Sequence, residues 1–194
     1  MPAPMIVRLA MENEAEERAA ELAELHADVY GGLAYASDPE GRDFAVRLRT
    51  QRRQPGFTLA VAFKGGYLLG AAMGMPLRPS TSWWRGVTAP LPDAVTAEHP
   101  GRTFALTDLM VRSAWRRQNI GRSLYEVLLA DRAEERATVV VPPAATAAQA
   151  AFQNWGWQKV ARTRTAAPGA AADVLTIDIP AAHAAAARAR DWWD

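Results

Sequence analysis

An arginine-rich turn between an apolar strand and an apolar helix is the segment best suited to chemistry. Residues 109–124 read LMVRSAWRRQNIGRSL. A helix N-terminus leaves about four backbone N–H groups without partners and carries roughly half a positive charge, so it can bind phosphate or pyrophosphate. Arg116, Arg117 and Arg122 add positive charge at the same place. The sequence therefore predicts an anion-binding turn.

This turn resembles the acetyl-CoA-binding signature of the GNAT superfamily of N-acyltransferases, Q/R-x-x-G-x-G/A. Arg116 takes the first place of the signature and Gly121 the last. Asn119 stands where the family has its first glycine. Asparagine tolerates left-handed backbone angles better than most residues, but its side chain lies where a phosphate would approach.

The flanking segments carry the same resemblance. The apolar stretch TFALTDLMV, Thr103 to Val111, matches the strand that precedes the signature in the family. Downstream, the family pattern N-x-x-A-x-x-x-Y-x-x-x-G-F is matched in type at Ala148, Gly156 and Trp157, and it departs at Ala145 and Phe152. The resemblance covers roughly residues 6 to 179.

The family implies an α/β (α+β) GNAT fold. Its central sheet is mixed but mostly antiparallel, with about seven strands, splayed fourth and fifth strands and about four flanking helices. We expect one domain over residues 1–179. Residues 180–194 would form a helical tail that docks on the body or on another subunit, which would give a homodimer.

Hydrophobic periodicity and turn residues place the elements. Asn13 and Glu16 suggest a capping box before the first helix, and Asp38 can cap the second, which contains the apolar pair Phe44 and Leu48. A long loop, with room for one helical turn, runs from Leu77 to Arg102. Strands are expected at 6–10, 57–63, 67–75, 103–111, 137–141, 159–164 and 174–179, and further helices at 14–29, 120–130, 145–154 and 181–190.

The resemblance also implies where a thioester donor binds. The pantetheine arm would lie along the backbone of Leu109, Met110 and Val111, and a backbone N–H near Met110 would stabilise the developing oxyanion. The amine would attack directly, without a covalent enzyme intermediate. The residues expected around the pyrophosphate are Gln118, Asn119, Ile120, Gly121, Arg122 and Ser123.

Asp108 is the candidate general base. Strand alternation puts its side chain on the face of Phe104 and Leu106, where burial would raise its pKa. Alternatively, it is a strand-end carboxylate paired with an arginine. Phe152 occupies the place of the tyrosine that protonates the leaving thiolate in many family members. The thiolate would then leave unaided or with help from water, or another residue would serve.

Four aromatic residues are candidates for the acceptor site. Tyr30 and Tyr35 follow the first helix, and Trp83 and Trp84 lie in the long loop. Indole rings could stack on a ring or a cation of the acceptor. The alternative for all four is local packing, with the tryptophans as loop anchors.

Composition limits the other classes of function. A net charge of +1 argues against nucleic acid or an anionic membrane as the main partner. The absence of cysteine excludes thiolate catalysis and cysteine-ligated zinc, and three dispersed histidines suggest no metal site. We find neither a signal-peptide pattern nor a membrane span, so we expect a cytoplasmic protein.

The sequence thus predicts an N-acyltransferase that moves an acyl group, by default acetyl, from acetyl-CoA or another acyl-CoA to a primary amine of a small molecule. Two alternatives remain open: donation from the phosphopantetheine of an acidic acyl carrier protein, and a non-catalytic GNAT-fold ligand-binding module. A carrier would meet the arginine cluster, which is otherwise a solvated basic face. The cluster comprises Arg112, Arg116, Arg117, Arg122, Arg132 and Arg136.

Overall fold

The computed structural model describes residues 3–33, 42–165, 170–180 and 183. The chain divides into two compact units, Met1–Met75 with Leu106–Arg132 and Pro76–Ala105 with Ala133–Asp194. The strand β4, Thr103–Val111, is divided between the two units after Ala105. Seven strands follow the order β1-β2-β3-β4-β5-β7-β6, so the predicted α/β class and the number of strands are confirmed.

Three antiparallel strands form the sheet of the first unit up to β4. They are β1, Met5–Leu9, β2, Thr58–Lys64, and β3, Tyr67–Pro76. The turn between β2 and β3 consists of Gly65 and Gly66, whose φ angles are 58° and 82°. Two consecutive positive φ angles match the right-handed twist of a hairpin and require glycine-like freedom, which explains the predicted hairpin.

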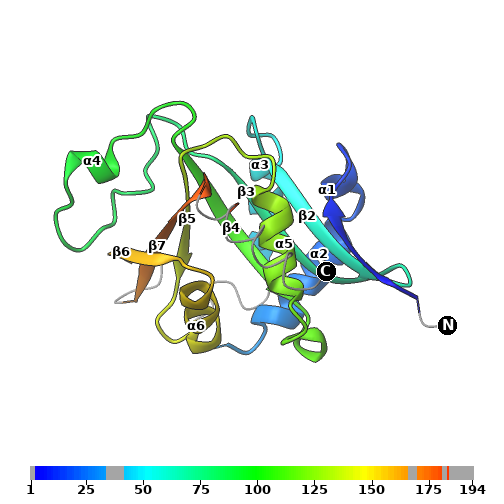
Figure 1. The fold of residues 1–194 in the computed structure, drawn as a ribbon. Helices are drawn as coiled ribbons and strands as arrows, with labels where there is room; N and C mark the ends of the chain where they lie inside the picture. The colour runs from blue at the N-terminus through cyan, green and yellow to red at the C-terminus, as the bar shows by residue number, and fades with distance from the viewer. Residues whose placement is uncertain (1–2, 34–41, 166–169, 181–182, 184–194) are drawn as a thin grey trace. The chain divides into compact units, whose positions relative to one another are not determined.

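Helices cover both faces of this sheet (Figure 1). Helices α2, Ala19–Tyr30, and α3, Arg42–Gln51, pack on one face, and α5, Ile120–Leu129, packs against β1 and β2. The predicted apolar pair of α3 is fully buried. The core on this side includes Leu22, Leu25, Phe44, Leu48, Leu59, Val61, Met73 and Met110.

The first predicted helix is interrupted, which corrects the sequence analysis. Helix α1, Glu14–Glu17, ends before Arg18, whose angles of φ −101° and ψ 16° separate it from α2. The predicted capping box is wrong, because Asn13 makes no side-chain cap bond. Instead the buried Glu14 carboxylate accepts bonds from the Met11 N–H and from the guanidinium groups of Arg8 and Arg18. A buried ion-pair network therefore sets this junction.

The second unit contains β5, Arg136–Val141, β6, Gln158–Arg164, and β7, Ala171–Asp178, which pairs antiparallel with the other two. Helix α6 spans Thr146–Asn154, and the long loop contains one helical turn, α4, at Asp93–Thr96, as expected. Val87 of this loop bridges Thr163, and the Arg164 N–H donates to the Gly86 carbonyl over 2.9 Å. The loop thus covers the outer edge of β6, which would otherwise offer unpaired backbone groups.

Some expectations fall outside this description. Tyr35, the Asp38 cap and most of the tail helix at 181–190 lie outside the described residues. The splay of the fourth and fifth strands and the single domain over 1–179 stay predictions. None of the helices in the described ranges is both long and apolar enough to span a membrane.

Candidate active site

Residues 112–123, here called the donor turn after their predicted role, contain two left-handed positions. After the 3-10 turn η1, Ser113–Trp115, the backbone is extended at Arg116 and left-handed at Arg117 and Asn119, with φ angles of 62° and 60°. Alternating backbone angles of this kind turn successive N–H groups toward one concavity. The left-handed angle at Asn119 is one that asparagine accepts more readily than most residues.

The start of α5 leaves these donors available. Within α5, the first N–H with an acceptor in the described chain is that of Ser123, which donates to the Asn119 carbonyl over 3.0 Å. Within the described part of the chain, no backbone or side-chain acceptor receives the N–H groups of Gly121 and Arg122. Unpaired N–H groups at the positive end of a helix dipole favour an anion.

The arginines of the turn differ in how they are used. Arg122 donates to Glu126 over 2.8 Å, so its charge is neutralised within α5. Arg116 is exposed and donates through Nε to the Val111 carbonyl over 3.2 Å. Arg117 is exposed, and none of the described acidic side chains lies within ion-pair distance of it. Arg116 and Arg117 therefore supply the uncompensated positive charge.

Strand β4 contains a bulge beside Met110. The Leu77 N–H donates to the Thr103 carbonyl, and the Arg112 N–H donates to the Leu69 carbonyl. Between these two bonds the chain advances eight positions on the β3 side and nine on the β4 side, so β4 holds one extra residue. A Cβ built on Gly70 would lie 2.6 Å from the Met110 oxygen and 3.4 Å from the Val111 Cα. The bulge therefore lies opposite Gly70, where only glycine leaves enough room.

Asp108 is both buried and paired with an arginine. Its side chain is 4% exposed, and Oδ1 accepts a 2.8 Å bond from Nη2 of Arg47 on α3. Its Oδ2 is buried and has no hydrogen-bond partner among the described residues. Burial raises the pKa of the Asp108 carboxyl above its ordinary value, and the Arg47 cation opposes that rise only in part.

Sequence reasoning missed Arg47. It lies 61 positions before Asp108, on the surface of a helix, and no local pattern links the two residues. Its guanidinium lies over the ring of Phe44, with the carbon Cζ 5.3 Å from the ring centroid. The amphipathic pattern of α3 could have located its buried face but not the strand that this face meets.

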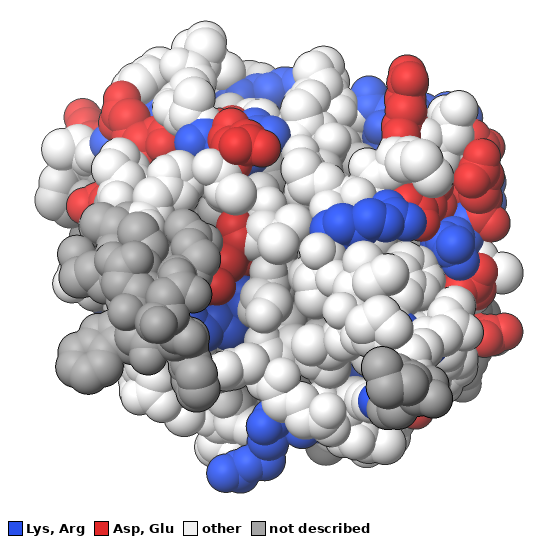
Figure 2. Space-filling view, turned by 45° about the vertical axis from the view of Figure 1, so that its right-hand side comes forward, with Lys and Arg blue, Asp and Glu red and all other residues white. Residues whose placement is uncertain are grey.

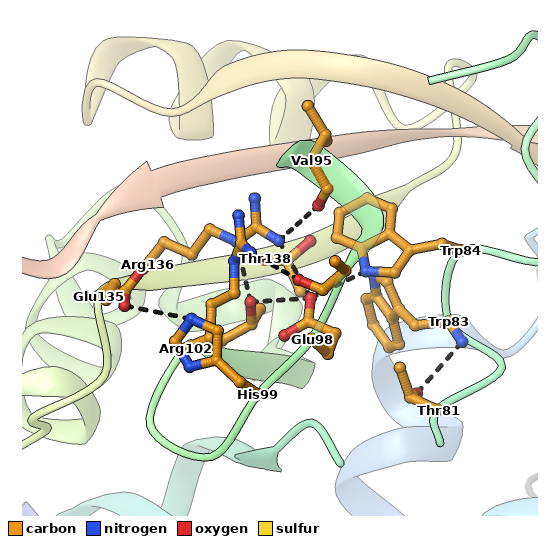
Figure 3. Close-up of polar contacts among 12 residues, drawn as sticks. Thr81, Trp83, Trp84, Val95, Glu98, His99, Arg102, Glu135, Arg136 and Thr138 are labelled. Carbon is orange, nitrogen blue, oxygen red and sulfur yellow. Dashed lines mark hydrogen bonds and ion pairs between the residues drawn. The ribbon is translucent and has the colours of Figure 1, made fainter. Parts of the chain in front are cut away.

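The loop tryptophans belong to a buried polar cluster in the second unit. The Trp84 indole N–H donates to Oε1 of Glu98 over 2.9 Å, and the same oxygen accepts bonds from Thr103 Oγ1 and Arg136 Nη2 at 3.0 Å each (Figure 3). The Glu98 side chain is 1% exposed. Trp84 thus anchors the long loop. The adjacent Trp83 is partly exposed, and its indole nitrogen is buried.

Arg136 does not contribute to a basic surface, which corrects the predicted arginine cluster. Its side chain is 13% exposed, and it donates to Glu98, to the Val95 carbonyl and to the Thr103 hydroxyl (Figure 3).

Tyr30, the other described acceptor candidate, is half-buried with its ring centroid 4.8 Å from that of His26.

Comparison with known families gives the decisive match. Residues 15–157 match the model of the acetyltransferase (GNAT) family, which is most of the chain. The chain belongs to the GNAT family of acetyltransferases. Among the curated proteins, the comparison finds no match.

Solved GNAT structures resemble this fold over nearly its whole length. An acetyltransferase from Thermus thermophilus has a TM-score of 0.63 at 17% identity, covering 92% of this chain and 99% of that one. The putative acetyltransferase yncA from Salmonella typhimurium, solved with its cofactor acetyl-CoA, has a TM-score of 0.63 at 14% identity, with 91% and 95% covered. The loading GNATL domain of CurA from Lyngbya majuscula has a TM-score of 0.64 at 9% identity, with 92% and 99% covered.

The place of the GNAT tyrosine is filled by a core residue. Phe152 on α6 is buried and makes edge-to-face contacts with Trp155 and Trp157, at centroid distances of 5.4 and 5.2 Å. A phenyl ring donates no proton, so this GNAT chain has no general acid at that position.

Over the described ranges, no group of three or more acidic, histidine or cysteine side chains is arranged to hold a metal ion.

Proposed function

We propose that this protein transfers an acyl group, by default acetyl, from an acyl-CoA thioester to the primary amine of a small molecule. The observation that carries the donor assignment is the left-handed backbone at Arg117 and Asn119 followed by the start of α5, where the N–H groups of Gly121 and Arg122 have no acceptor in the described chain. That arrangement suits a pyrophosphate. The exposed cations Arg116 and Arg117 beside it suit the same ligand.

The reaction needs a base and an oxyanion donor. In the proposed mechanism, Asp108 receives the proton of the attacking amine, and a backbone N–H near Met110 stabilises the negative charge on the thioester oxygen. The C–N bond forms as the C–S bond breaks. Because Phe152 cannot protonate the thiolate, the leaving group relies on its own low basicity, with a thiol pKa of about 8.5, or on water.

Calorimetry with acetyl-CoA, followed by turnover assays on a panel of amines, tests this proposal. Arg117→Glu should weaken acetyl-CoA binding roughly tenfold or more, since it replaces an attractive charge with a repulsive one. Arg53→Glu makes the same charge change at an exposed position outside the donor turn and should leave the affinity unchanged. Binding without turnover on any amine would favour the non-catalytic module.

A carrier protein is the alternative donor, and the exposure of Arg116 and Arg117 is the observation that favours it. An acidic carrier would deliver the same pantetheine thioester and would be attracted by uncompensated cations. Rates with free acetyl-CoA and with an acetylated carrier distinguish the two donors. Equal or faster use of free acetyl-CoA would remove the carrier from consideration.

A further inference from the structure

Arg47 holds one oxygen of the Asp108 carboxylate. Arg47 donates to Oδ1 over 2.8 Å, whereas Oδ2 is buried and finds no partner within the described residues. A buried polar atom without a hydrogen bond costs about 1–3 kcal/mol, so such atoms in folded proteins are usually satisfied by a ligand or by water. Oδ2 is therefore the oxygen of Asp108 that remains available to accept a proton.

Arg47 is itself fixed in place. Its guanidinium lies over the Phe44 ring, which is fully buried and stacks on the His26 ring with centroids 4.5 Å apart. The cation–π contact holds the flat face of the guanidinium, and the ion pair holds its edge. The side chain is still 37% exposed, so its substitution leaves the helix core intact.

We propose that Arg47 is a positioning residue: it holds Oδ1 of Asp108 so that Oδ2 faces the acceptor and receives its proton. This inference rests on the proposed function. In the step, the amine nitrogen forms the C–N bond, its N–H bond breaks, and the proton passes to Oδ2. The thioester C–S bond breaks and the electron pair leaves on sulfur. Oδ2 then returns its proton to water.

Arg47 also sets the charge balance of the carboxylate. Arg47 from α3 is the charged group that acts on Asp108. The hydroxyl of Thr107, the preceding residue of β4, is an uncharged group that also favours the carboxylate. Burial favours the protonated acid and the Arg47 cation favours the carboxylate. Without Arg47, Asp108 would hold its proton to a higher pH, and a protonated acid cannot act as a base.

The test is the pH dependence of kcat/KM in three variants. In Arg47→Met, the acidic limb of the profile should move upward by about 1–3 pH units, while activity recovers on the alkaline side. Arg47→Lys keeps the positive charge and should return most of that shift. Arg49→Met removes a charge from an exposed position on the same helix and should leave the limb where it is in the unaltered protein.

An unmoved acidic limb in Arg47→Met overturns the proposal, even if kcat falls, because a purely structural role would lower the rate at every pH. Thermal unfolding of both Arg47 variants verifies that they are folded, and Arg47→Gln, which also removes the positive charge, carries the test if Arg47→Met is not. Loss of activity in Asp108→Asn with an unmoved limb in Arg47→Met would remove only the role of Arg47. Absence of turnover in the unaltered protein would overturn the proposed function as well.

Discussion

Asp108 combines two properties that usually oppose each other, burial and charge. Its carboxyl is almost fully enclosed and has one cationic partner, and its pKa lies above the ordinary value. A raised pKa means that the folded protein disfavours the ionised form relative to the unfolded chain. The residue therefore costs stability at neutral pH, which is typical of a group retained for chemistry.

Asp108→Asn tests both properties. The variant should lose about 10²- to 10⁴-fold in kcat/KM, because the amide cannot accept the proton. Its melting temperature should equal or exceed that of the unaltered protein, since a neutral group replaces a disfavoured buried charge. Asp43→Asn on the exposed surface of α3 is the matched control. A marked fall in melting temperature would show that the ion pair with Arg47 is net stabilising.

At the scale of elements, the bulge in β4 depends on a glycine in the neighbouring strand. Gly70→Ala places a methyl group 2.6 Å from the Met110 oxygen, so the backbone of β4 must shift. We expect a loss of about 1–3 kcal/mol in the free energy of unfolding and weaker acetyl-CoA binding by calorimetry.

Gly86→Ala is the matched control for this prediction. It brings a methyl group 2.7 Å from Thr163 Oγ1, in the loop on β6, so it should lower stability and leave the acetyl-CoA affinity unchanged. Equal acetyl-CoA affinities in the two variants would show that the bulge does not influence donor binding.

The long loop is held by the buried pair of Glu98 and Arg136. Arg136→Met leaves the Glu98 carboxylate buried without its cation, which should lower the free energy of unfolding by about 3–5 kcal/mol. Chemical denaturation measures the loss. The double variant with Glu98→Gln removes the stranded charge and should recover much of it. If the double variant loses as much stability as the two single variants together, Glu98 and Arg136 do not stabilise the fold as a coupled pair.

At the scale of the whole molecule, opposite charges lie close together. The face seen in Figure 2 shows Lys and Arg side chains next to Asp and Glu. Surface ion pairs of the described chain include Arg52–Glu16 and Arg122–Glu126. A net charge of +1 with paired surface ions gives little long-range steering toward a polyanion. We therefore expect donor binding to depend on the local geometry of the turn.

Acid stability should report the Glu14 network. Hydrogen bonds from Arg8 lower the pKa of Glu14 from 4.5 to about 2, with smaller contributions from the Met11 N–H and Arg18. A depressed pKa adds stability that is fully present above pH 4.5 and is lost as the pH falls toward about 2. The contribution is about 3 kcal/mol.

Denaturation midpoints measured between about pH 6 and pH 2 check this expectation. The free energy of unfolding should fall more steeply in the unaltered protein than in Glu14→Gln, which lacks the titrating carboxyl. Glu12→Gln, at an exposed neighbouring position, should follow the unaltered protein. Parallel curves for all three proteins would contradict the assigned role of Glu14.

The amino-acid sequence by itself determined most strands, the glycine turn between β2 and β3 and the start of α5. These features arise from contacts between near neighbours: alternation along a strand, the φ freedom of Gly65 and Gly66, and the backbone N–H groups at the start of a helix. The capping box at Asn13 failed because Glu16 pairs instead with Arg52, 36 positions away, a contact that no local pattern shows.

Only the tertiary structure decided which side chains meet. Arg47 reaches Asp108 across 61 positions, Arg136 reaches Glu98 across 38, and the bulge in β4 lies opposite a glycine from another strand. No local period encodes such pairs, because each depends on the register in which separate elements pack. Burial then sets the energies of these contacts. A charged side chain is well solvated in water, whereas a buried charge is strongly unfavourable unless it is paired with an opposite charge.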